Sequence, residues 1–202
     1  MITFNKFLTI IIALYCCVGI LCIYAFAPAN DTCTLSNDYT VSIHGTSNIH
    51  NWDEKVGTVS GKGTVNKGSN GNYDLASVSI IIDVHSIKST EGSGMDNNTY
   101  KALKADTYPQ ITFVLTAPLN SLQSTSTPVF AKGNLTIAGV TKAISLVVNI
   151  SMPVDGKLTF QGSQNILMSD YNVTPPTALF GTIKAGNLIT LNFKTNFSIT
   201  AN

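Results

Sequence analysis

The sequence predicts an all-β protein, an eight-stranded antiparallel barrel with one short inserted helix. From Tyr39 onward, short stretches alternate apolar residues with Ser, Thr, Asn or Lys, the period-2 pattern of strands that bury one face. Clusters of Gly, Asn, Asp and Pro separate these stretches, and residues 94–106 alone have helical spacing. Because each strand has one apolar face and the hairpin spacing is regular, a closed barrel is favoured over a two-sheet sandwich.

The first half of the barrel is expected from three strands and the helix. The strands cover about 39–47, 55–66 and 75–84, and the glycines of the second predict bulges or a sharp coil of the sheet. The apolar face of the third strand is expected to contain Ala76, Val78, Ile80, Ile82 and Val84. For the helix, Ser93 or Asp96 is available as N-cap and Pro109 stands just beyond its end.

Five further strands are predicted from their apolar faces. These faces are Ile111, Phe113 and Leu115; Val129, Leu135 and Ile137; Ile144, Leu146, Val148, Ile150 and Met152; Leu158 and Phe160, extended to Ile166 and Met168; and Ile189, Leu191, Phe193, Phe197 and Ile199. The interior of an eight-stranded barrel is either filled by side chains or holds one ligand. A membrane barrel would show the same alternation, but its apolar band is flanked by aromatic girdles that this sequence lacks.

The N-terminus predicts an exported protein. Lys6 precedes an apolar stretch at 7–27 that ends in overlapping Ala-x-Ala sites, as in a secretory signal peptide. We expect the signal peptide to cover 1–29, with cleavage after Ala29, because the earlier site would leave Pro28 at the start of the chain. A linker at 30–38 and a barrel domain at 39–202 would follow. The alternative is a retained anchor at 7–26, which is long enough to span a bilayer. Either way the domain is expected to be periplasmic or secreted.

Charge and cysteine content exclude several functions. Without Lys6 the chain has eleven lysines against eleven acidic residues, and it contains no arginine. Such a chain presents no basic surface for a nucleic acid, so we expect no nucleic-acid partner. Three of the four cysteines lie in the leader, and Cys33 remains alone in the expected linker. The exported chain therefore cannot form an intramolecular disulfide.

The sequence contains no motif that predicts catalysis or metal binding. There is no Gly-x-Ser-x-Gly, Gly-rich phosphate loop or His-Glu-x-x-His. His44 and His85 fall on polar strand faces without the spacing of zinc ligands. The carboxylates are scattered singly, apart from Asp53 and Glu54. We therefore expect no catalytic residue, no metal and no cofactor, although acid and base groups distant in sequence can still meet in space.

Three blocks of sequence carry a resemblance to a known family. They are GTSNIHNW at 45–52, MDNNTYKALKADTYPQITF at 95–113 and GNLTIAGVTK at 133–142. In this order they resemble the YceI family of exported bacterial proteins, over about 39–200. The resemblance implies an extended lipocalin-like barrel whose apolar channel binds a polyisoprenoid or similar long-chain lipid, with no settled enzymatic activity. Relatives usually carry His-Asp-Trp where this chain has His50, Asn51 and Trp52, and Asp53 follows directly.

Candidate ligand contacts are the middle of the apolar strand faces together with the single tryptophan. They are Trp52, Ile80, Ile82, Phe113, Leu146, Val148, Phe160, Leu191 and Phe193. Trp52 is either a wall of the channel or a plug at one barrel end, since large aromatic side chains serve both roles. His50 is either a polar contact at the barrel mouth or a residue that fixes the local turn through its ring nitrogens.

The function expected from these features is passive binding. The ligand would be a long isoprenoid or similar apolar lipid, held for storage or transport in the cell envelope. Because the chain has no arginine, a neutral quinone-like head group fits it at least as well as a diphosphate. The alternatives are a structural or interaction barrel with a filled core and, third, an enzyme that acts on a lipid. A peripheral encounter with a membrane and a homodimer are both compatible with the sequence.

Overall fold

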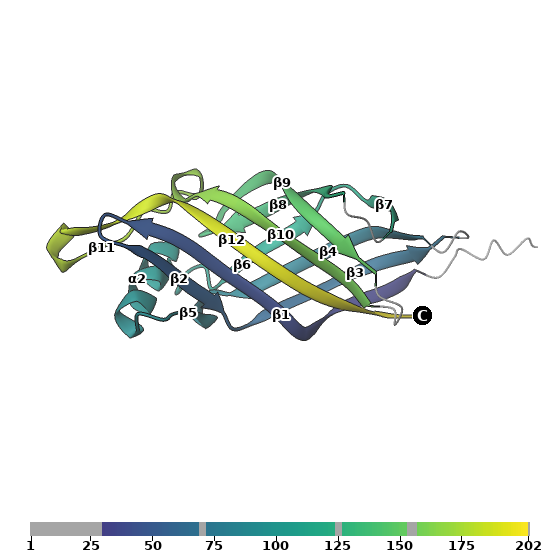
Figure 1. The fold of residues 1–202 in the computed structure, drawn as a ribbon, viewed down its shortest axis with the longest axis horizontal. Coiled ribbons are helices and arrows are strands. Elements are labelled where there is room, and N and C mark those ends of the chain that lie inside the picture. Colours follow the sequence, from purple (N-terminus) through teal and green to yellow (C-terminus); the bar gives the residue numbers. More distant parts are fainter. Residues whose placement is uncertain (1–29, 69–71, 124–126, 153–156, 202) are drawn as a thin grey trace, which may run out of the picture.

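The computed structural model describes residues 30–68, 72–123, 127–152 and 157–201. Most of these residues lie in one antiparallel sheet that curls into a long barrel (Figure 1). The expected signal peptide at 1–29 and its cleavage site lie outside the described residues. Across the described ranges, no helix combines the length and the apolar character needed to cross a membrane.

Eight strands close the barrel, as predicted. Around the barrel they are β1 (Asp31–Ser47), β3 (Val59–Lys67), β4 (Tyr73–Asp83), β6 (Gln110–Leu115), β8 (Val129–Ile137), β9 (Val140–Ser151), β10 (Lys157–Leu167) and β12 (Ile183–Thr200). The last strand pairs with the first in antiparallel register, from Thr32 opposite Thr200 to Ser47 opposite Ala185. This pairing removes both free edges of the eight-stranded sheet and encloses its apolar face.

The remaining elements lie toward the two ends of the barrel. They are β2 (Asn51–Val56), β5 (Ile87–Ser89), β7 (Leu119–Leu122), β11 (Thr177–Ala178), the helix α2 (Ser93–Leu103) and the short 3-10 helices η1 (Val84–Ser86), η2 (Met168–Tyr171) and η3 (Leu179–Gly181). Figure 1 places α2, β2, β5 and β11 at one end, called the helix end below. The C-terminus of the chain and β7 lie at the opposite end, called the terminal end.

The first strand is longer than predicted. It begins at Asp31, so the segment expected to be a linker at 30–38 is part of the barrel. There Cys33 pairs with Ile199 of β12 on one side and Gly63 of β3 on the other. Its thiol is buried, and this burial raises the pKa of Cys33 to about 11. The polar composition of this segment concealed the strand, because pairing on both sides stabilises it more than its own sequence pattern does.

The strand expected at 55–66 is in fact two strands. The chain leaves the sheet at Gly57 and Thr58, between β2 and β3, and the Gly57 amide donates to the Ser86 carbonyl at 2.9 Å. On either side of this break, β3 pairs with the first part of β1 and β2 pairs with its later part, so β2 continues the barrel wall at the helix end. Gly61 and Gly63, where a bulge was expected, lie in regular register, and the extra residue is on β4 instead. There the pairing shifts from Thr64 opposite Ser77 to Val65 opposite Leu75 and leaves out Ala76.

That shift overturns one predicted face of β4. Ala76 was expected inside, but it is exposed, whereas Leu75 is buried. One extra residue in a bulge reverses which side chains point to the core from that point of the strand. Beyond the bulge, Val78, Ile80 and Ile82 face the interior as predicted.

The helix lies between β5 and β6, as expected, but its N-cap differs from the prediction. Gly92, at φ 94°, occupies the cap position, and no side chain caps the helix. Asp96 instead accepts hydrogen bonds from the Ser89 amide at 2.8 Å and pairs with the Lys88 ammonium at 3.1 Å. These contacts fasten the first turn of α2 to β5 and hold the helix across the barrel mouth.

Candidate functional site

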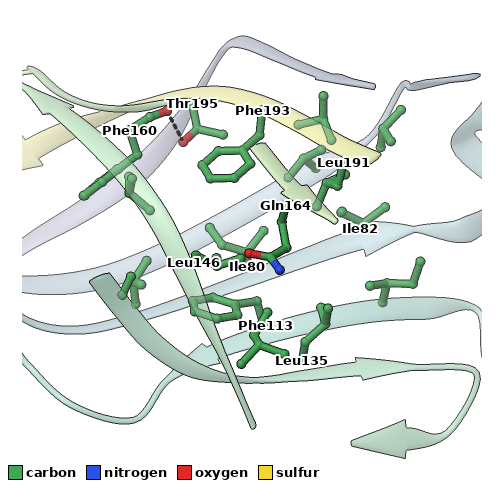
Figure 2. A pocket seen from close by; sticks show the side chains of 18 of the residues that line it. Ile80, Ile82, Phe113, Leu135, Leu146, Phe160, Gln164, Leu191, Phe193 and Thr195 are labelled. Atoms are coloured by element: carbon green, nitrogen blue, oxygen red, sulfur yellow. Dashed lines mark hydrogen bonds between the residues drawn. The ribbon is translucent and has the colours of Figure 1, made fainter. Parts of the chain in front are cut away.

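An apolar cavity, called the lumen cavity, runs through the middle of the barrel (Figure 2). Its volume, counted as the space open to the centre of a water-sized sphere, is about 150 Å³, and one water molecule needs about 10–15 Å³ on this measure. All the residues that line it are apolar except Gln164 and Thr195. The barrel interior is therefore not filled by side chains along its whole length.

The structure brings together the predicted contacts of the strand faces. Eight of them line the lumen cavity: Ile80, Ile82, Phe113, Leu146, Val148, Phe160, Leu191 and Phe193. They come from five strands, β4, β6, β9, β10 and β12. Several, such as Ile82 and Leu191, face inward yet are only half-buried. Apolar side chains that keep accessible surface toward an enclosed space are typical of a ligand pocket rather than a packed core.

Glycines in the barrel wall help to keep this space open. A Cβ atom at Gly133 would lie 2.3 Å from Cε2 of Phe113, and one at Gly162 would lie 2.7 Å from Cζ of Phe193. Both aromatic rings thus rest directly on the backbone of a neighbouring strand. A ring seated over a glycine occupies the wall of the barrel and leaves more of the centre free.

Gln164 is the polar group that the sequence analysis missed in the lumen. Its side chain extends into the cavity from β10 (Figure 2), and its Nε2 donates to the Asn165 carbonyl at 2.9 Å. The alternation that placed Phe160 inside also places residue 164 inside, because the two differ by an even number of positions. Thr195, the other polar lining residue, donates through Oγ1 to the Phe160 carbonyl at 3.4 Å.

A second cavity, called the mouth cavity, lies at the helix end under α2. On the same measure its volume is about 80 Å³. Its lining consists of Ile43, Trp52, Glu54, Met95, Thr99, Ala102, Leu103, Ile111, Ile137, Ile166, Met168, Tyr171, Val173, Pro176 and Ile189. Five isoleucines of this set also line the lumen cavity. The two cavities therefore adjoin, with these isoleucines at their common boundary.

Trp52 lines the mouth cavity rather than the lumen cavity, unlike the other predicted contacts. Its indole Nε1 donates to the Thr46 carbonyl at 3.0 Å, and the side chain is 6% exposed. A Cβ atom at Gly45 would lie 2.1 Å from Cζ2 of Trp52, so the ring lies flat on β1 where that strand has no side chain. Trp52 is thus a wall of the cavity and closes the barrel at the helix end.

His50 lines neither cavity. Its exposed ring donates from Nδ1 to the Asn51 carbonyl at 2.7 Å and lies 3.4 Å from the Glu91 carboxylate. The carbonyl of His50 accepts hydrogen bonds from the backbone amide and hydroxyl of Ser47, both at 2.8 Å. This geometry fits the alternative in which His50 belongs to the local turn.

Asp53, the acid nearest to that turn, points away from the cavities. It accepts a hydrogen bond from His44 Nδ1 at 3.0 Å on the outer face of the sheet, where both side chains are exposed. His85 lies 4.0 Å from Asp106 at another exposed place. Among the described residues, no three His, Cys, Asp or Glu side chains gather closely enough to hold a metal ion.

Glu54 is the buried acid that the sequence analysis did not single out. It shares the inner face of β2 with Trp52 and Val56, and it is 2% exposed. Its Oε1 accepts a hydrogen bond from Thr99 Oγ1 of α2 at 2.5 Å. Burial raises the pKa of Glu54 above its ordinary value, the Thr99 hydrogen bond opposes this rise, and the negative charge of Asp96 adds to it. The signal for this position was an acid placed between two inward-facing apolar residues.

The closed eight-stranded barrel with an apolar lumen defines a lipocalin-like architecture, a class that can hold one ligand inside. The YceI-like domain family matches this chain over residues 26–197. The chain therefore belongs to the YceI-like family, as the three sequence blocks predicted.

Solved structures of similar fold come from several bacteria. A polyisoprenoid binding domain from Saccharophagus degradans, implicated in plant cell wall breakdown, has a TM-score of 0.65 and 13% identity over 83% of this chain and 98% of its own. Burkholderia cenocepacia BcnA has a TM-score of 0.56 and 22% identity, over 78% of this chain and 95% of its own. The Campylobacter jejuni YceI protein has a TM-score of 0.56 and 22% identity, over 74% of this chain and 85% of its own. Comparison with curated protein sequences finds no match. At these identities the likeness establishes the fold.

Proposed function

We propose that this protein binds a long apolar chain, a polyisoprenoid or an isoprenoid quinone, and stores or carries it in the cell envelope. The observation that carries the proposal is the pair of adjoining apolar cavities inside a closed barrel. The polyisoprenoid-binding description of the Saccharophagus degradans neighbour supports the ligand class. The predicted signal peptide supports the compartment.

The binding free energy would come from removal of the tail from water. Each CH₂ group that is buried contributes about 0.8 kcal/mol, before the costs of association and of ordering the tail are subtracted. The lumen offers few polar partners, because its two polar side chains already donate to backbone carbonyls. Length and shape of the tail would therefore decide affinity more than polar recognition does. This is passive binding rather than catalysis.

We also propose that the protein contacts the membrane transiently through its helix end. Leu179 and Phe180 lie in η3, next to β11, with exposed fractions of 67% and 110%. Both have positive φ, 47° and 55°, so the turn presents two apolar side chains to the surroundings instead of to the core. Exposed apolar side chains beside a pocket often mark a site of membrane or protein contact. An apolar ligand could then pass between bilayer and barrel without crossing water.

Native mass spectrometry tests the binding proposal. The exported chain is purified without detergent, and we expect a co-purified apolar molecule together with a change of Trp52 fluorescence when isoprenoids are added. Leu146→Trp should block the lumen and abolish both signals. Val147→Trp, the outward-facing neighbour on β9, is the matched control and should retain them. A mass equal to the bare polypeptide, with unchanged fluorescence, would sink the proposal, and turnover of the bound lipid would favour the enzyme alternative.

A further inference from the structure

The Glu54 carboxyl is buried in the mouth cavity without a cationic partner. Its one side-chain hydrogen-bonding partner among the described residues is the Thr99 hydroxyl. The ion pair in this region joins Lys88 of β5 to Asp96 of α2 and does not include Glu54. The described lining of the mouth cavity contains no lysine. Glu54 is thus an acid in a largely apolar cavity that adjoins the lumen cavity.

Such a carboxyl is stable in its neutral form. A carboxylate that is removed from water and not paired is strongly disfavoured, and the group takes up a proton instead. In that form one oxygen accepts the Thr99 hydrogen bond, and the carboxyl keeps one O–H donor for another partner. A donor without a fixed partner inside an apolar cavity is the kind of group that orients a ligand.

We propose that the mouth cavity is a subsite for a neutral, oxygen-bearing head group, and that the Glu54 carboxyl donates a hydrogen bond to the carbonyl or hydroxyl oxygen of that head group. The inference rests on the proposed function and specifies its ligand as an isoprenoid quinone or an isoprenoid alcohol. The tail would run past the five shared isoleucines into the lumen cavity. Trp52 and Tyr171, which line the same cavity, would flank the head group.

Charge at the subsite selects against an anionic head group. Thr99 of α2 contacts Glu54, and the charge of Asp96 on the same helix acts on it. Lys88 lies on the neighbouring strand β5, and Tyr171 of η2 lines the same cavity. Lys88 is held by Asp96, and burial raises the pKa of Tyr171, so the phenol stays neutral. A diphosphate here would lose its hydration and meet acidic groups without a free cation. The chain has no arginine that could compensate.

Four ligands with the same four-isoprene tail test the subsite: a naphthoquinone, an alcohol, a diphosphate and a plain hydrocarbon. Binding to the full exported chain is measured by Trp52 fluorescence and native mass spectrometry. We expect Glu54→Leu to weaken the quinone and the alcohol about fivefold to tenfold, the loss of one hydrogen bond, and to leave the hydrocarbon unchanged. Glu54→Gln, whose amide also donates, should retain the affinity.

The pH dependence gives a second readout. Wild-type affinity for the quinone should fall as the pH rises through the raised pKa of Glu54, because the donor proton is lost. The Glu54→Gln variant should show a flat profile. Loss of hydrocarbon affinity in Glu54→Leu to the same extent as quinone affinity, or a diphosphate that binds as tightly as the quinone, would overturn the inference and leave the proposed function intact. If none of the four ligands binds, the proposed function falls and this inference falls with it.

Discussion

The two ends of the barrel are built from the same alternating strands, yet one end is packed and the other is hollow. At the terminal end, Cys33, Val65, Leu158 and Phe197 are at most 1% exposed, and the rings of Phe160 and Phe197 meet edge to face at 5.6 Å. At the helix end, α2 spans the mouth and leaves a cavity that contains a buried acid. Strand alternation therefore determines which side chains point inward, while the elements that cover each end determine how tightly those side chains pack.

The largest expected effect of a substitution on stability lies at the terminal end. Phe197→Ala should lower the free energy of unfolding by about 3–5 kcal/mol, because the fully buried ring leaves a void beside Phe160. Leu191→Ala changes a half-buried residue on the same strand, closer to the helix end, and should lower the free energy of unfolding clearly less. Urea unfolding monitored by circular dichroism measures both. Equal costs would show that the lumen is as tightly packed as the terminal end.

The next effect concerns the wall of the mouth cavity. Gly45→Val should destabilise the protein by about 1–3 kcal/mol, because a Cβ atom would collide with the Trp52 ring. Displacement of that ring should also shift its fluorescence emission to longer wavelength. Gly94→Ala is the control, since a Cβ atom there meets nothing within 4 Å and that position lies in α2. An unshifted emission in Gly45→Val would contradict this role of Gly45.

Glu54 makes stability depend on pH at the helix end. Its folded-state pKa is raised above 4.5, so between that value and the raised pKa the folded protein binds more protons than the unfolded chain. The free energy of unfolding attributable to Glu54 therefore falls as the pH rises through this window. Glu54→Gln should remove this fall, so its advantage over the wild type grows from pH 4.5 upward and then levels off.

Urea midpoints measured between pH 4 and pH 8 test that difference. Asp53→Asn is the matched control, because this acid lies on the opposite, exposed face of the same strand. Its profile should follow that of the wild type more closely than the Glu54→Gln profile does. Parallel profiles of wild type and Glu54→Gln would mean that Glu54 titrates as an ordinary exposed acid.

The smallest effect on stability is expected at η3. Replacing Leu179 and Phe180 together by serine should change the free energy of unfolding by no more than about 0.5 kcal/mol, since both side chains are exposed. It should nevertheless slow the uptake of an isoprenoid quinone from phospholipid vesicles. Phe130→Ser, an exposed aromatic on β8, is the control and should leave uptake unchanged. Equal uptake by all three proteins would remove the proposed membrane encounter from the helix end.

The family blocks meet in space at the helix end. Trp52 packs on Gly45 within the first block. Thr99 of the second block donates to Glu54. Tyr108 of the second block packs on Gly139 of the third, where a Cβ atom would lie 2.5 Å from the ring. Residues of all three blocks thus form contacts at the helix end that a Cβ atom at Gly45 or Gly139 would disturb.

The alternation of side chains along the strands correctly predicted many of the residues that line the lumen cavity. Phe113, Leu146 and Leu191 were placed inside because each lies on the apolar face of a regular strand, and each lines the cavity. The same reasoning failed at Ala76, where a bulge reversed the faces. A bulge depends on the pairing of two strands, so the alternation within one of them does not reveal it.

Two polar residues in the cavities show a second limit of prediction from the sequence. Gln164 and Glu54 occupy inward-facing positions, but a polar residue in an alternating strand is ordinarily assigned to the wet face. Glu54 belongs inside because Thr99 supplies a hydrogen bond from another element. The partner lies 45 positions away, so this compensation exists only once α2 has docked over β2.

By itself the sequence determined the all-β class, the eight strands of the barrel, the inserted helix and the family, because period-2 alternation and the three sequence blocks can be read along the chain. The tertiary structure decided where the first strand begins, where β4 changes face and that a buried acid lies beside the lumen. These features depend on pairing between distant strands and on burial. Both are properties of the closed barrel and of the helix that covers its mouth.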